Sequence, residues 1–438
     1  MTPDLPTAEG NPDASPTGRD SAWLEAAAAL GARLCRDAVW DGARCNWLGD
    51  SSEFVGQAWT VVHKAMGAEL YDGTAGIALF LAHLHALTGE PPFRTAAEGA
   101  LRHVLSRRAH IGQHAPIAFH AGKSGVAWVL AEVGDLLASE EYAAAARELA
   151  DEVAAAEPDP QLVDVISGSA GAIPALLGFA DRWGDGFQAA AVRHGEHLLH
   201  IARPGPAGTS WRTLEMDAQD LTGYSHGAAG VALALLELAV RTGEARFRAV
   251  AEDGFRYERS HFSPRYGNWP DFRNMSGTGY GAHANEPSYA MAWCHGAPGI
   301  GLSRVRAWRL TGDDVYRQEA EVALRTTAHS IQATAQTGST GFSLCHGDAG
   351  NAELFLLAEE AFGGGQYRAL AEEVGARGVT WYLRQRAPWP CGIPDGGETP
   401  NLMLGLAGIG YFYLRLHDPA AVPSILLVTP RDKPSASS

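Results

Sequence analysis

The sequence predicts an all-α protein, an α/α toroid in which seven inner and seven outer helices form a double ring. Two observations predict this fold. A Gly-x-x-Gly motif recurs seven times at intervals of 46 to 69 residues, and a strongly apolar run follows each copy. Repeats of about 50 residues, each one helix pair, are typical of repeat architectures. The copies are Gly73/Gly76, Gly122/Gly125, Gly168/Gly171, Gly227/Gly230, Gly296/Gly299, Gly347/Gly350 and Gly405/Gly408.

The two kinds of helix differ in composition. Runs such as IALFLAHLHAL and VALALLELAV are apolar on most sides, which predicts helices that are buried on most sides. More polar, amphipathic segments come before the motifs and are expected to form the outer ring. Examples are residues 22–36, 94–108, 140–156, 187–200, 314–333 and 367–384. Thr-Gly-acid connectors at 88–90, 242–244 and 311–313 suit a left-handed helix end followed by a new helix start.

The ring is expected to close. An open helical solenoid is the alternative, but it needs polar capping repeats, and no obviously polar terminal repeat is present. Glycine permits close backbone approach, so the inner-helix starts would crowd together at one mouth of the ring. The side chains that flank the glycines should therefore carry the chemistry. Among these, Asp72 and Lys123 are expected to be solvated or capping residues.

Composition limits the possible partners and location. The net charge of −16 argues against nucleic acid, which is bound by clustered Lys and Arg. The chain has no secretory signal and no apolar run of about 20 residues. Its five scattered cysteines do not form a disulfide framework, so we expect a cytoplasmic protein without a membrane span. Residues 1–20 and 429–438 are predicted to be disordered tails around one domain, 21–428.

Two near-identical segments predict a metal site. Cys294-His295-Gly296 lies in WCHGAPG, and Cys345-His346-Gly347 lies in LCHGDAG, 51 residues later. Thiolate and imidazole are usual ligands of zinc, and three protein ligands with an open fourth position are typical of a catalytic site. Buried cysteines without a metal are the alternative, but the duplication favours ligands. The spacing does not decide whether His295 or His346 binds, because their local sequences are equivalent.

Two further residues are candidates for proton transfer. His226, in GYSHGAAG, stands at the matching place of the fourth repeat and could act as general acid or base. Asp164, in DVISGSAG, could orient a histidine or act alone. The alternatives are a packed histidine and a simple acid at a helix start.

Two thiolate ligands would lower the effective charge of a metal, which favours thiol chemistry over water activation.

Two long insertions, 203–225 and 258–292, carry many aromatic residues among Gly, Pro and Asn. Long ordered loops beside a site often form lids or binding walls, and packed surface excursions are the alternative.

Several motifs carry a family resemblance. WCHGAPGIGL, SLCHGDAGNAE, GYSHGAAG and LMLGLAGIGYFYLRL resemble the lanthionine synthetase C-like cyclases, and most closely the cyclase half of class II lanthipeptide synthetases, over about residues 20–428. The resemblance implies a seven-fold α/α toroid with Zn²⁺ at its mouth. It also implies Cys294, Cys345 and His346 as the zinc ligands, His226 as the catalytic acid/base and Asp164 as the active-site aspartate.

The resemblance also implies a reaction and its partners. Cyclases of this family add a Cys thiolate of a ribosomally made precursor peptide to dehydroalanine or dehydrobutyrine, forming lanthionine or methyllanthionine. No dehydratase segment precedes residue 20, so we expect a separate dehydratase or kinase-lyase partner. Ala290 stands where stand-alone class I members often carry Arg. Addition of glutathione or another small thiol, or a non-catalytic peptide-binding scaffold, are the alternative functions.

Overall fold

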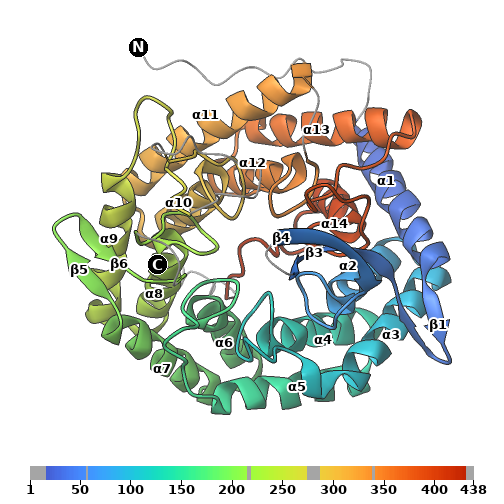
Figure 1. Ribbon diagram of the computed structural model, residues 1–438, viewed down its shortest axis with the longest axis horizontal. Coiled ribbons are helices and arrows are strands. Elements are labelled where there is room, and N and C mark those ends of the chain that lie inside the picture. Colours follow the sequence, from blue (N-terminus) through green and yellow to red (C-terminus); the bar gives the residue numbers. More distant parts are fainter. Residues whose placement is uncertain (1–15, 56–57, 215–218, 274–286, 338–340, 431–438) are drawn as a thin grey trace.

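The computed structural model describes residues 16–55, 58–214, 219–273, 287–337 and 341–430. In these residues fourteen α-helices alternate between an inner and an outer position around a central axis (Figure 1). The inner helices are α2 (Thr74–Thr88), α4 (Lys123–Leu137), α6 (Ser169–Trp183), α8 (Ala228–Thr242), α10 (Ala297–Thr311), α12 (Asp348–Phe362) and α14 (Leu406–His417). The outer helices are α1 (Pro16–Asp37), α3 (Pro91–Ser106), α5 (Glu140–Ala155), α7 (Gly186–His200), α9 (Ala245–Ser260), α11 (Asp314–Thr337) and α13 (Gln366–Gly378).

The inner helices close into a ring. Each contacts the next one along the chain, and α14 returns to contact α2. Each of the first six inner helices also packs on the outer helix that follows it, and α14 packs on α1, the first helix of the chain. This closure confirms the predicted toroid and excludes the open solenoid, because no described repeat is left with an uncovered end.

The helix ends follow the predicted chemistry. Gly89, Gly243 and Gly312 end α2, α8 and α10 with φ of 71°, 75° and 71°, the left-handed conformation that glycine adopts most readily. Helix α1 begins at Pro16, so residues 16–20, which we expected in a disordered tail, are helical, and residues 1–15 lie outside the described part. After α13 the predicted helix continues only as a π-helical turn, Val379–Arg384, and a short 3₁₀ helix, Arg108–His110, follows α3.

The prediction of an all-α fold missed three antiparallel hairpins. They are β1 (Val39–Asp41) with β2 (Arg44–Asn46), β3 (Leu48–Val55) with β4 (Ala58–Ala65), and β5 (Arg203–Gly205) with β6 (Gly208–Ser210). The β3–β4 register places Phe54 opposite Trp59 and Ser52 opposite Val61. Aromatic and β-branched residues favour such cross-strand pairs, and this enrichment near residue 60 was the missed signal.

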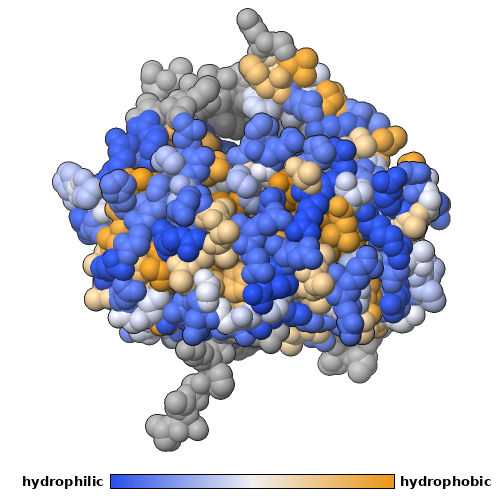
Figure 2. All heavy atoms as spheres, turned by 90° about the horizontal axis from the view of Figure 1, so that it is seen from below, coloured by the Kyte–Doolittle hydropathy of each residue, from blue (hydrophilic) through white to orange (hydrophobic). Residues whose placement is uncertain are grey.

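The surface agrees with the amphipathic outer helices. Figure 2 shows one side of the ring, where hydrophilic residues predominate and hydrophobic residues are scattered between them. The apolar helices are the inner ones, and among the described residues no helix combines the length and hydrophobicity needed to cross a bilayer.

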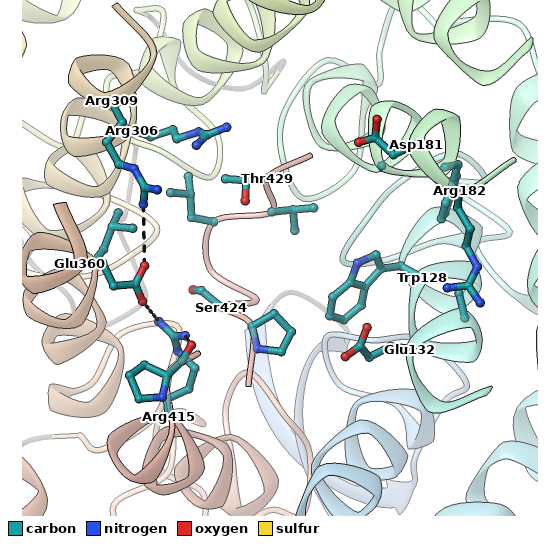
Figure 3. A pocket seen from close by; sticks show the side chains of 18 residues that line it. Trp128, Glu132, Asp181, Arg182, Arg306, Arg309, Glu360, Arg415, Ser424 and Thr429 are labelled. Carbon is teal, nitrogen blue, oxygen red and sulfur yellow. Dashed lines mark hydrogen bonds and ion pairs between the residues drawn. The ribbon is translucent and has the colours of Figure 1, made fainter. Parts of the chain in front are cut away.

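The C-terminal segment runs into the centre of the ring. The Tyr411 hydroxyl donates to the Pro423 carbonyl at 2.8 Å, and the Trp293 indole N–H donates to the Leu426 carbonyl at 2.8 Å. A cavity of about 410 Å³ lies beside this segment, near the C-terminal ends of α6, α10, α12 and α14 (Figure 3). Among its charged groups, Glu360 lies 3.8 Å from Arg309 and 3.6 Å from Arg415. The glycine motifs lie at the opposite ends of the inner helices.

The second glycine of the motif is required by close backbone approach. A Cβ atom at Gly125 would lie 1.7 Å from the carbonyl oxygen of Phe119, and one at Gly350 would lie 1.8 Å from that of Leu344. No side chain can be accommodated there without moving backbone. The motif therefore allows each inner helix to begin directly against the loop that precedes it.

Replacing Gly125 by alanine is expected to lower the free energy of unfolding by about 3 kcal/mol, because overpacking against backbone forces the loop to shift. Gly178→Ala in α6 is the matched control. Its Cβ would meet nothing within 4 Å, so alanine should be neutral or stabilise the helix by up to about 1 kcal/mol. Urea unfolding of both variants measures the difference, and equal effects would contradict the close-approach argument.

Candidate metal centre

Cys294, Cys345 and His346 converge at the starts of α10 and α12. One ligand atom from each residue can be chosen so that all three lie within 4.8 Å of one another. Both cysteines are buried, and His346 is half-buried. Two thiols and one imidazole could hold a metal ion, and this donor set is typical of Zn²⁺. The duplicated motif therefore brings both of its cysteines, but only one of its histidines, to a single point.

The surrounding contacts distinguish the two histidines. His346 Nε2 lies 2.8 Å from the Gly392 carbonyl and donates to it, so Nδ1 keeps its lone pair for a metal. His295 instead is fully buried and directs Nδ1 to the Thr222 carbonyl at 3.1 Å. Burial lowers the pKa of His295 to about 3, so this ring is neutral.

The two thiols are hydrogen-bonded to each other, with Cys294 as the donor. Donation to Cys345, together with burial, raises the pKa of Cys294 well above its usual value. Donation from Cys294 lowers the pKa of Cys345 despite burial, and the Tyr71 hydroxyl, 3.0 Å from its Sγ, acts in the same direction. A dication bound between the sulfur atoms would take the place of thiol hydrogen, because metal-bound cysteine is deprotonated. The residues thus fit a divalent metal.

An arginine that sequence reasoning missed acts on both thiols. The positive charge of Arg273 lowers the pKa of Cys294 and of Cys345, secondary to the hydrogen bonding and burial described above. Its guanidinium is held by the buried Asp271 carboxylate, with Nη2 2.7 Å from Oδ2. Both residues lie in the 258–292 insertion. The only sequence feature that pointed to them was the position of this insertion directly before Cys294-His295-Gly296. Tyr71 was also missed, although it lies two residues before Gly73.

The half-buried His226 and the buried Asp164 form a pair beside the metal ligands. His226 Nδ1 donates to Asp164 Oδ2 at 2.6 Å, and the Ser167 backbone N–H donates to the other carboxylate oxygen at 2.7 Å. Burial alone would lower the pKa of His226, but the Asp164 charge and hydrogen bond raise it above its usual value. The ring also stacks on His295, with centroids 5.8 Å apart. Asp164 thus engages Nδ1 of His226, and Nε2 is the ring nitrogen that does not bond to Asp164.

One turn connects this pair to the metal ligands. The backbone N–H groups of Tyr224 and Ser225 donate to the Cys294 carbonyl at 3.2 and 3.1 Å. The Ser225 carbonyl accepts from the N–H of Val165, the neighbour of Asp164, at 3.0 Å. The turn that carries His226 therefore fixes the Cys294 and Asp164 segments on its two sides.

The aromatic insertions are mostly packed. Trp211, Tyr224 and Trp269 are buried, and the Trp211 indole donates to the Leu198 carbonyl at 2.9 Å. Tyr266 remains exposed and stacks on Tyr289 with centroids 4.1 Å apart. Residues 215–218 and 274–286, including Tyr280, lie outside the described residues. Lys123, as expected, makes a surface ion pair, 2.7 Å from Glu152.

Comparison with known proteins gives matches at the level of the family, of the structure and of an individual sequence. A sequence model described as lanthionine synthetase C-like protein matches residues 64–427, well over half of the chain. Nisin cyclase has a similar structure, with a TM-score of 0.62 at 16% identity, covering 81% of this chain and 90% of nisin cyclase. The lacticin 481/lactococcin biosynthesis protein LcnDR2 of Lactococcus lactis subsp. lactis is 22% identical over 201 residues, 45% of this chain. This chain matches only 20% of the length of LcnDR2.

The structural match establishes a common fold, because identity at this level carries no more than that. The family match rests on the same region that contains the seven glycine motifs and both Cys-His-Gly segments. Together they confirm the predicted α-helical toroid and the predicted resemblance. The chain belongs to the lanthionine synthetase C-like family.

Proposed function

We propose that this protein is a zinc-dependent lanthipeptide cyclase, which adds peptide Cys thiolates to dehydroalanine or dehydrobutyrine to form lanthionine or methyllanthionine. The observation that carries the proposal is the convergence of Cys294, Cys345 and His346 beside the His226–Asp164 pair, in a chain of the lanthionine synthetase C-like family. The similarity to nisin cyclase and to a lacticin biosynthesis protein supports a peptide substrate of this kind.

Zn²⁺ at the three ligands would supply the Lewis acidity that keeps a substrate thiol ionised near neutral pH. The side chains of the protein would supply the proton that the addition requires. The thiolate sulfur bonds to the β-carbon of the dehydro residue, and the electron pair of the broken π-bond moves into an enolate. The thiol proton would leave to solvent as the thiolate forms. His226 Nε2 would give its proton to the α-carbon of the enolate and be reprotonated by solvent, so that the addition has no net proton change.

Asp164 would hold His226 in one tautomer. Its hydrogen bond keeps a proton on Nδ1, and its charge keeps the imidazolium stable enough to serve as the acid. Arg273 would add positive potential near the anionic sulfur atoms. A separate dehydratase or kinase-lyase would supply the dehydrated precursor peptide. Because the reaction uses reduced thiols, we propose that it occurs in the cytoplasm.

The direct test is incubation of zinc-loaded protein with a dehydrated precursor peptide that contains Cys. The free thiols of the peptide should disappear at unchanged peptide mass, because addition within one chain is an isomerisation. Thiol alkylation followed by mass spectrometry counts the remaining thiols, and a Cys→Ala peptide is the control. Thiol loss no faster than the spontaneous rate would contradict the proposal.

The same assay distinguishes the other candidate functions. A dehydrated peptide without Cys, given with excess glutathione, gains the mass of the thiol if the protein adds small thiols instead. Tight peptide binding without either product indicates a scaffold.

A further inference from the structure

A buried carboxylate of the outer ring reaches the turn that carries His226. Glu258 lies near the end of α9 and is fully buried. Its Oε1 accepts the backbone N–H of Gly223 at 2.9 Å and that of Ala229 at 3.0 Å. These two donors bracket His226 in sequence. One carboxylate oxygen therefore ties together both ends of the turn.

The corresponding outer-helix position of the first repeat carries a different residue and makes a different contact. In the first repeat His103, four residues after Gly99, places Nδ1 2.9 Å from the hydroxyl of Thr74 at the start of α2. Glu258 likewise follows Gly254 by four residues. The fourth repeat thus has a carboxylate at this place, and the carboxylate bonds the backbone on both sides of the proposed acid.

The Glu258 carboxylate is buried and only partly hydrogen-bonded. Its Oε2 has no hydrogen-bond partner among the described residues, and neither has Nη2 of the buried Arg304. Arg304 Nε donates to Glu319 Oε2 at 2.6 Å, so Arg304 is shared between two acids. Burial raises the pKa of Glu258 to about 7, while Arg304 and the two backbone donors lower it. A buried, partly unsatisfied carboxylate is unfavourable by itself. If packing were the only role of this position, an apolar residue would make the folded protein more stable.

We propose that Glu258 is a positioning residue that fixes the turn of residues 221–229, so that the His226 ring stays hydrogen-bonded to Asp164 and next to Cys294. The kinetic part of this inference rests on the proposed function, and its structural part does not. The chain of contacts is continuous: Glu258 holds Gly223 and Ala229, and the intervening Tyr224 and Ser225 hold the Cys294 carbonyl.

The kinetic test compares three variants. Glu258→Ala releases the turn, and its kcat is expected to fall at least about 10-fold with KM within about two-fold of wild type, because small misplacements of a catalytic group have large effects. Glu258→Gln keeps the accepting oxygen and should stay within about three-fold of wild type. Glu237→Gln is the matched control, since Glu237 is a buried acid paired with Arg306 at 2.6 Å, farther along α8 from the turn.

A second readout does not need activity. The Nδ1–H proton of His226 should give a downfield resonance, identified by its loss in Asp164→Asn. This resonance should vanish or move upfield in Glu258→Ala and persist in Glu258→Gln and Glu237→Gln. If Glu258→Ala does not fold, Glu258→Asp replaces it, because the shorter side chain keeps the charge but cannot reach both donors.

The outcomes separate the two proposals. A wild type that forms no rings, with the resonance lost in Glu258→Ala but kept in Glu258→Gln and Glu237→Gln, contradicts the proposed function and supports the positioning role. A folded Glu258→Ala variant with an unchanged resonance and unchanged kcat overturns the positioning role. Equal losses in Glu258→Ala and Glu237→Gln also overturn it, because they would reflect general destabilisation.

Discussion

Replacement of Cys345 by alanine is expected to abolish zinc binding and ring formation together. Cys345 is the centre of the ligand cluster: its sulfur accepts from Cys294 and from the Tyr71 hydroxyl. Changes outside the ligand shell already reduce metal affinity by about 10- to 100-fold, so removal of a thiolate should exceed about 100-fold. Elemental mass spectrometry should find about one zinc per wild-type chain and almost none in the variant.

The control is Cys35→Ala. Cys35 is also a free cysteine, but it lies on α1, where its sulfur contacts the Pro92 carbonyl at 3.6 Å. This variant should keep its zinc. Added zinc should also raise the melting temperature of wild type and of Cys35→Ala in a concentration-dependent manner, without effect on Cys345→Ala. A folded, zinc-treated wild type without metal, or a Cys345→Ala variant that retains it, would refute the site.

The sequence predicted the ring because the ring depends on local features. The second glycines of the motif are needed where a loop carbonyl would lie within 2 Å of a Cβ atom, as at Gly125 and Gly350. The apolar runs mark helices buried on most sides. Both signals recur at regular intervals, so they can be recognised and counted within this chain alone. They placed the inner-helix starts, and with them both cysteines of the cluster.

The remaining parts of the site depend on contacts that local sequence does not encode. His295 and His346 stand in equivalent tripeptides, and only the distant carbonyls of Thr222 and Gly392 separate a packed histidine from a candidate ligand. Arg273 and Glu258 reach the site from an insertion and from an outer helix. No motif marks them, because their roles arise from tertiary proximity. The β3–β4 hairpin was missed for a related reason, since helical periodicity elsewhere dominated the interpretation.

Replacement of His226 by glutamine is expected to lower kcat by about 100- to 10,000-fold, the usual range for loss of a general acid or base, without loss of zinc. His226 does not belong to the ligand cluster, so metal content should stay near one per chain and separate this variant from Cys345→Ala. His110→Gln, an exposed histidine of the 3₁₀ turn, is the control and should behave as wild type. Equal activity of the two variants would exclude His226 as the acid.

The pH dependence gives an independent check on the pair. The pKa of His226 is held above its usual value: burial lowers it, but the Asp164 charge and hydrogen bond outweigh burial. The protonated ring therefore persists to higher pH, and activity that needs this acid should fall only as pH rises through the raised pKa. Asp164→Asn removes the raising contribution, so the alkaline fall of kcat should move to lower pH. An unmoved or upward-shifted alkaline limb would show that Asp164 does not set the protonation of His226.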